Sequence, residues 1–254
     1  MTSSNPRVVV RGLVLRGTDT KETDRILTVL THELGLITVI AKGARSRRSR
    51  YAAVCRNLAY GELTLSRSGR WYYLTEGATL ELFPGLTADI GKLALGAYFA
   101  ELTEAVCTEG EDTGALLRLL LNALYALSCL DRPARLIKVG FTWRLMALSG
   151  FAPLTDACAV CGKEPEEPLL DTLHGVVHCA RCPTEGLSVP LTRAALAALD
   201  YILTCDPKRL YHFTLERGSL RLLDHAAEAF TAAQLERSFH TLNYYKSVSS
   251  EEEL

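Results

Sequence analysis

Four cysteines are the residues whose type and spacing point most directly to chemistry. Cys158 and Cys161 form one C-x-x-C pair, Cys179 and Cys182 form a second, and 17 residues separate the pairs. Two thiolates on one tight turn can both reach a metal ion at about 2.3 Å, and two such turns complete a tetrahedron. Four protein ligands leave no open coordination position for a reaction. The pattern therefore predicts one structural Zn²⁺ per chain.

Two other interpretations of these cysteines are a redox-active dithiol and a chance pairing. A lone C-x-x-C pair would leave both open, whereas two pairs at this separation favour zinc. His174 and His178 lie between the pairs and could replace a cysteine as ligand. We interpret both histidines as surface residues or as neighbours of the site.

Five cations crowd the nine positions from residue 42 to residue 50, between two segments with strand-like sequences. They are Lys42, Arg45, Arg47, Arg48 and Arg50, and Tyr51 follows directly. Guanidinium groups beside aromatic rings suit a nucleic-acid strand, because the charges bind phosphates and the rings stack on bases. We predict that these six residues bind DNA. A solvated hairpin without a ligand is the alternative.

Three further aromatic residues follow in a later strand-like segment. Trp71 and Tyr73 share one face of that segment and Tyr72 points to the other, because alternate residues of a strand point the same way. These rings could add stacking surfaces for bases. For Trp71 we favour a place in the core of a barrel.

No common catalytic motif is present in the sequence. It contains no G-x-x-x-x-G-K-[ST] phosphate loop, no H-E-x-x-H zinc site and no G-x-S-x-G nucleophile turn. The six histidines are dispersed, and none stands beside an obvious nucleophile. We expect a protein that is not an enzyme.

The net charge of −1 hides an uneven distribution of charge. Residues 1–80 carry thirteen Lys and Arg against six Asp and Glu, a net +7, and the remainder carries a net −8. A basic front end on an acidic body indicates a polyanionic partner for the front end. No apolar run approaches the roughly 20 residues of a membrane span, and the first seven residues lack the apolar stretch of a signal peptide. We expect a cytoplasmic protein without membrane contact.

Hydropathy patterns predict an α+β chain. Five short strand-like segments separated by turn signals fill the first 82 residues, which predicts a small barrel with the OB-fold as leading candidate. From residue 86 onwards apolar residues recur with helical spacing. We expect an OB-fold over 1–83, a helical domain over 84–152, a four-cysteine zinc element over 153–188, and a second helical part with an acidic, frayed tail over 189–254.

Several segments carry a resemblance to a known family. They are TDRILTVLT (23–31), GLITVIAKGAR (35–45), LFPGL (82–86) and LSGFAPL (148–154), the last leading to the first cysteine pair. In combination they resemble RecO, a family of bacterial recombination mediators and DNA repair proteins. The resemblance spans nearly the whole chain.

The resemblance implies an N-terminal OB-fold, a helical domain and a zinc-binding element, although some members of the family lack the cysteines. It implies binding to single- and double-stranded DNA and annealing of complementary strands. It also implies that the protein works with RecR, and in some bacteria RecF, to replace single-strand-binding protein by RecA on the nucleoid. The basic segment of the family's OB-fold matches Lys42, Arg45, Arg47, Arg48 and Arg50.

The family's helical domain can also receive the acidic, hydrophobic C-terminal tail of single-strand-binding protein. Arg132, Arg135 and Lys138 are the nearest candidates for that contact in this chain. An alternative of a different class is a zinc-stabilised adaptor that holds partner proteins and makes little contact with nucleic acid. The acidic body of the chain is compatible with this alternative, whereas the net +7 of the front end favours DNA binding.

Overall fold

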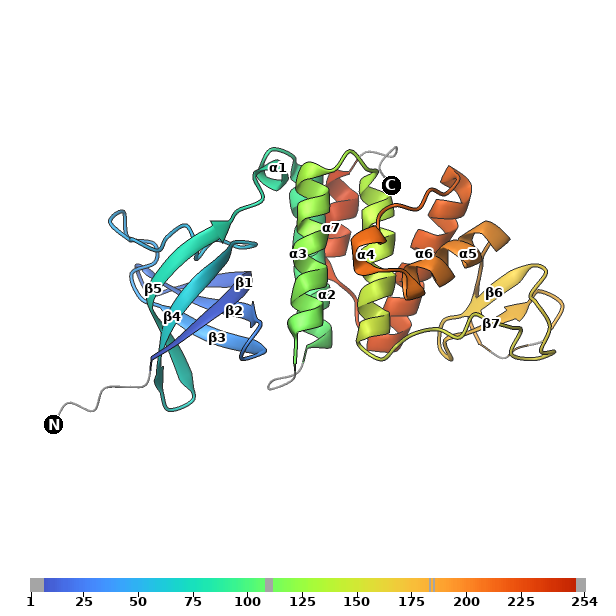
Figure 1. Cartoon of the computed structure of the whole chain (residues 1–254), viewed down its shortest axis with the longest axis horizontal. Coiled ribbons are helices and arrows are strands. Elements are labelled where there is room, and N and C mark those ends of the chain that lie inside the picture. Colours follow the sequence, from blue (N-terminus) through green and yellow to red (C-terminus); the bar gives the residue numbers. More distant parts are fainter. Residues whose placement is uncertain (1–6, 108–111, 183, 185, 250–254) are drawn as a thin grey trace. The chain divides into compact units, whose positions relative to one another are not determined.

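The computed structural model describes residues 7–107, 112–182, 184 and 186–249 (Figure 1). The chain forms two compact units, Met1–Ser128 and Cys129–Leu254. Residues 1–6 and 250–254, the latter including most of the expected acidic tail, lie outside the described residues. Within the described ranges, no helix is both long enough and apolar enough to cross a membrane.

The first unit begins with a closed barrel of five strands, drawn in blue to teal in Figure 1. The strands are β1 (Arg7–Thr20), β2 (Asp24–Thr31), β3 (Leu36–Ala41), β4 (Tyr60–Ser68) and β5 (Trp71–Glu81). Their order around the barrel is β1-β2-β3-β5-β4, and β4 pairs with β1 to close it. A five-stranded Greek-key barrel is the OB-fold architecture, so the predicted fold is confirmed.

Alternating side chains of the strands fill the barrel. In β3, Ile37, Val39 and Ala41 are buried while the residues between them are half-buried, as expected when successive side chains point to opposite faces. Leu63 and Leu65 of β4 are fully buried in the same core. Because β3 ends at Ala41 and β4 begins at Tyr60, the cationic segment lies in the connection between these strands, with its cationic side chains exposed and Ala44 packed into the core.

Three helices complete the first unit: α1 (Pro84–Thr87), α2 (Ile90–Val106) and α3 (Gly114–Cys129). The Asp89 side chain accepts a hydrogen bond from the Lys92 N–H at 3.0 Å and so caps the start of α2. Arg16 of β1 forms a bidentate ion pair with Glu104 of α2, at 2.9 Å between Nε and Oε2. The first compact unit, Met1–Ser128, thus includes these helices as well as the barrel.

The second unit consists of helices and one small sheet. The helices are α4 (Ala134–Leu148), α5 (Arg193–Thr204), the 3₁₀ turn η1 (Pro207–Arg209), α6 (Arg217–Leu235) and α7 (His240–Val248). Trp143 of α4 is fully buried, and its ring lies 5.2 Å from that of Phe230 of α6. The sheet contains β6 (Pro168–Asp171), β7 (Val176–Cys179) and β8 (Ser188–Pro190) in the order β7-β6-β8. This sheet carries part of the four-cysteine element.

Candidate metal centre and nucleic-acid interface

The structure brings the four predicted cysteine ligands together. The sulfur atoms of Cys158, Cys161, Cys179 and Cys182 all lie within 4.8 Å of one another. The Sγ atoms of Cys161 and Cys179 are 3.9 Å apart, close to the roughly 3.8 Å edge of a tetrahedron of sulfurs bound at about 2.3 Å to one Zn²⁺. The spacing of the thiols thus fits a tetrahedral metal ion.

Two tight turns and a strand hold these cysteines in place. The Gly162 N–H donates to the Cys158 carbonyl at 2.9 Å, and Gly162 has a left-handed φ of 70°, which glycine adopts without strain. The second pair begins at the end of β7, where the Cys182 N–H donates to the Cys179 carbonyl at 3.0 Å. Each pair therefore presents both of its thiols from one turn.

Hydrogen bonds also favour the thiolate at one position. Burial opposes ionisation of Cys158, but backbone N–H groups of Cys161, Cys179 and Val160 outweigh it and lower the pKa of the Cys158 thiol to about 6. The Cys179 N–H lies 3.3 Å from the Cys158 sulfur. The thiolate is the form that binds metal. The pKa values of the Cys179 and Cys182 thiols are instead raised, by burial and in part because a thiolate at Cys158 repels a second negative charge beside it.

The two nearby histidines have partners other than the thiol cluster. His174 Nδ1 lies 2.8 Å from Asp171 Oδ2, and the carboxylate of Asp171 also accepts the His174 N–H, holding the β6–β7 turn. His178 is buried, with Nε2 2.8 Å from the hydroxyl of Ser188 and Nδ1 3.1 Å from the Cys179 carbonyl. Both histidines therefore support the sheet that positions the cysteines.

The cationic segment forms an exposed loop, which we call the arginine loop (residues 42–51). All five of its predicted cations, Lys42, Arg45, Arg47, Arg48 and Arg50, are exposed. Tyr51 is half-buried and its hydroxyl donates to the Lys42 carbonyl, so the ring ties the two ends of the loop together. This hydrogen bond therefore constrains the conformation of the arginine loop.

Not all of these cations are equally free. The Arg45 guanidinium pairs with Asp19 at 3.2 Å and donates to the Glu22 carbonyl at 3.3 Å. By contrast, Arg47, Arg48 and Arg50 have no acidic partner within 4 Å among the residues that the structure describes. These three guanidinium groups are therefore the ones most available to an anion.

The aromatic residues of β5 do not all occupy the predicted environments. Trp71, for which a core position was favoured, is 39% exposed, so that interpretation is wrong. The physical reason is that Trp71 is the first residue of β5, at the end of a hairpin that continues beyond the core. Tyr72 instead packs against the barrel core, and Lys42 Nζ lies 5.2 Å from the centre of the Tyr73 ring.

The helical cations lie in an environment different from the expected one. Arg132 is exposed before α4, but Arg135 and Lys138 of α4 are only 5% and 1% exposed. Lys138 pairs with Asp224 at 2.9 Å and with Glu228, and Arg135 lies 3.6 Å from Asp224. Arg135 and Lys138 are therefore buried against the acids of α6 that neutralise them, and the two side chains form no exposed cationic rim. A partner contact at these residues stays a prediction.

The ion cluster allows a stability prediction. Removing one partner of a buried ion pair leaves an uncompensated buried charge, which destabilises a protein by about 3–5 kcal/mol. We therefore expect Lys138→Ala to lower the free energy of unfolding by that amount, measured by urea denaturation. The exposed neighbour Arg132→Ala serves as control and should change it by less than about 0.5 kcal/mol. Equal stabilities of the two variants would contradict the assignment.

Two functional candidates escaped the sequence analysis. Arg67 and Arg70 flank the turn between β4 and β5 and lie over aromatic rings of β5, Tyr72 and Trp71 respectively. The segment RSGRWYY (67–73) interleaves arginines with aromatics, which was a usable signal. Two cations in seven residues are a weaker signal than the five cations in nine residues of the arginine loop.

A five-stranded OB barrel with an exposed basic loop, followed by a helical unit with a four-cysteine cluster, defines an OB-fold protein with a cluster of thiols that could hold a metal ion. Two family models match the chain. Recombination protein O N terminal covers residues 6–83, and Recombination protein O C terminal covers residues 87–243. The chain therefore belongs to the Recombination protein O (RecO) family.

Similar proteins in other organisms carry the corresponding name. The DNA repair protein RecO of Acetivibrio thermocellus is 28% identical over 240 residues, which are 93% of this chain and 95% of that protein. The DNA repair protein RecO of Symbiobacterium thermophilum is 28% identical over 247 residues, 95% of this chain and 97% of that protein. The DNA repair protein RecO of Clostridium acetobutylicum is 25% identical over 241 residues, 93% and 97% of the two chains. Each of these relatives is thus matched over nearly its whole length.

Proposed function

We propose that this protein is a recombination mediator that binds single- and double-stranded DNA, anneals complementary strands and, with RecR, helps to replace single-strand-binding protein by RecA. The observation that carries the proposal is the arginine loop on a barrel of the RecO family, in which the exposed Arg47, Arg48 and Arg50 have no acidic partner within 4 Å among the described residues. Such groups bind phosphates, which both forms of DNA offer.

Annealing follows from the same charges. Two complementary strands repel each other, and bound cationic side chains offset that repulsion while the bases remain free to pair. No step of this process breaks or forms a covalent bond, so it needs no catalytic residue. Family resemblance supports the partners RecR, single-strand-binding protein, RecA and, in some bacteria, RecF. It also supports a cytoplasmic location at the nucleoid.

The metal centre is assigned a structural role in this proposal. Four thiolates with tetrahedral spacing suit Zn²⁺, which would be held by Cys158, Cys161, Cys179 and Cys182. A bound ion would cross-link the two turns and the sheet of the second unit. The arginine loop belongs to the first unit, so zinc is not required at the DNA contacts themselves.

The tail of single-strand-binding protein remains a proposed ligand of the helical unit. Arg132 is the exposed member of the three predicted contact residues, whereas Arg135 and Lys138 are neutralised by Asp224 and Glu228. A tail contact through Arg135 or Lys138 would require these ion pairs to open. Among the three residues, we therefore propose Arg132 as the one most accessible to the tail of single-strand-binding protein.

The proposal is tested by annealing of two complementary oligonucleotides labelled with a fluorophore and a quencher. We expect the protein to accelerate annealing severalfold or more in the absence of any nucleotide, since no phosphate loop is present. Heat-denatured protein and an equal concentration of a protein of similar net charge serve as controls. An unchanged annealing rate would favour the alternative of a zinc-stabilised adaptor with little nucleic-acid contact.

A further inference from the structure

Asp19, near the end of β1, pairs with two arginines at once. Its Oδ1 lies 3.1 Å from Nε of Arg25 in β2, and its Oδ2 lies 3.2 Å from Nε of Arg45 in the arginine loop. The register of the strands explains this arrangement. Asp19 lies opposite Arg25, and Arg25 lies opposite Ala41, the residue before the arginine loop. One row across three strands therefore brings a carboxylate to the start of the arginine loop.

The two arginines are held to different degrees. Arg25 donates to the carbonyls of Cys55 at 2.8 Å and Gly17 at 3.0 Å, and its side chain is 20% exposed. The Arg45 side chain is 44% exposed, and beside its ion pair it donates to the Glu22 carbonyl at 3.3 Å. Arg25 is therefore the firmly held partner of the carboxylate, and Arg45 is the one that can exchange its anion.

The backbone around Arg45 is fixed although its side chain is exposed. The Arg45 N–H donates to the Thr23 carbonyl at 2.9 Å, and the Gly43 N–H donates to the Asp24 carboxylate at 2.8 Å. These bonds tie the first residues of the arginine loop to the turn between β1 and β2. The Arg45 guanidinium can thus change its partner by rotation of the side chain alone. Asp19 keeps Arg25 as a partner when this happens, so no unpaired carboxylate is left.

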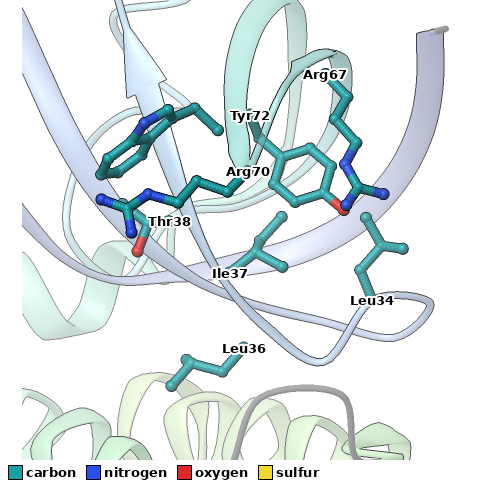
Figure 2. A pocket seen from close by; sticks show the side chains of 8 residues that line it. Leu34, Leu36, Ile37, Thr38, Arg67, Arg70 and Tyr72 are labelled. Carbon is teal, nitrogen blue, oxygen red and sulfur yellow. The ribbon is translucent and has the colours of Figure 1, made fainter.

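Other cations of the barrel lack such a carboxylate. The remaining four cations of the arginine loop have none within 4 Å among the described residues. Figure 2 shows Arg67 and Arg70 in a hollow at the start of β3, and none of the side chains that line it is a carboxylate among the residues that the structure describes. Arg45 differs from these cations because a carboxylate already occupies its anion-binding position.

We propose that Asp19 is an internal competitor that holds Arg45 until a DNA phosphate displaces it. The inference rests on the proposed DNA binding and adds a positioning residue to it. Carboxylates and phosphates accept hydrogen bonds from the same fork of guanidinium N–H groups, so the two compete for Arg45. When Arg47 and Arg48 hold neighbouring phosphates, the strand is present beside Arg45 at a high effective concentration. A lone anion lacks this advantage, so the exchange favours a polyanion.

The affinity of Asp19→Asn for an oligothymidylate tests the competition. Exposed ion pairs are weak, so removal of this one should tighten binding by about 1.5- to 5-fold. The slope of log K against log salt should stay that of the wild type, because the same phosphates are contacted. Glu22→Gln is the matched control, since it removes one charge three residues away from a carboxylate without a cation within 4 Å among the described residues. It should tighten binding by less.

A double variant tests whether Asp19 acts through Arg45. Arg45→Ala should make the slope shallower than that of the wild type by about 0.7, the contribution of one phosphate on a single strand. In the Arg45→Ala background, Asp19→Asn should change the affinity no more than Glu22→Gln does. Nitrogen NMR of the arginine side chains gives a readout independent of affinity. The Nε–H signal that is lost in Arg45→Ala should shift in the wild type when the oligonucleotide is added.

The results that overturn the inference differ from those that overturn the proposed function. An unchanged slope in Arg45→Ala, or a slope steeper by about 0.7 in Asp19→Asn, would mean that Asp19 retains Arg45 and is not displaced. Equal effects of Asp19→Asn and Glu22→Gln would refute a specific role of Asp19. Weaker binding by Asp19→Asn together with a lower melting temperature would make Asp19 a structural residue. Absence of any DNA binding by the wild type would refute both proposals.

Discussion

Replacing Arg45, Arg47, Arg48 and Arg50 by alanine is expected to make the salt dependence of single-strand binding shallower by about 2 to 3 units. Each phosphate neutralised on a single strand contributes roughly −0.7 to the slope of log K against log salt. Arg47, Arg48 and Arg50 account for about 2 units, and Arg45 adds to this only if its pairing with Asp19 opens. The slope is measured by fluorescence anisotropy over a series of salt concentrations.

The same variant should lose affinity for all sequences alike, because phosphate contacts carry no base information. Annealing should fall with affinity, while the fold and the metal content should survive, since the replaced side chains are exposed. A matched control replaces four exposed cations outside the barrel, namely Arg118, Arg193, Lys208 and Arg209. If both variants keep the slope of the wild type, the arginine loop is a solvated hairpin and DNA must bind elsewhere.

Loss of the metal is expected to have the other large effect. Metal binding at a site formed only in the folded state is linked to folding, so Cys161→Ser should lose the ion and unfold the element around β6 and β7. We expect one zinc per chain in the wild type by elemental analysis, and a melting temperature lower by several degrees in the variant. A chelator should have the same effect on the wild type.

The exposed Cys129, which lies outside the cluster, provides the control through Cys129→Ser. This variant should keep both zinc and stability. Zinc-free wild-type protein, or equal stability of the two serine variants, would rule out the structural metal. DNA binding should persist in Cys161→Ser, because the arginine loop lies in the other unit.

The barrel and the cysteine cluster were predictable because their signals are local. Alternation of apolar residues predicted the strands, and two C-x-x-C pairs predicted a cluster whose thiols the structure places within 4.8 Å. The sheet β7-β6-β8 was not predicted, since strands of three or four residues are too short for a clear alternation. It supplies the rigid support for Cys179.

The environments of single side chains were less predictable, because they depend on contacts between distant segments. Lys138 is buried only because Asp224 and Glu228 of α6 neutralise it, and nothing near it in sequence indicates this. Trp71 is of a residue type that is common in protein cores. It lies, however, in the part of the β4–β5 hairpin that extends past the end of the barrel. The ion pair of Arg16 with Glu104 likewise joins residues that lie 88 positions apart in the sequence.

The most direct test of the proposed function as a DNA-binding recombination mediator is the affinity of the wild type for a single-stranded oligonucleotide, measured as a function of salt concentration. Contact of the arginine loop with three or more phosphates predicts a slope of log K against log salt of about −2 or steeper. A slope near zero, or no binding at low salt, would contradict the proposed recombination-mediator function and favour a zinc-stabilised adaptor between proteins.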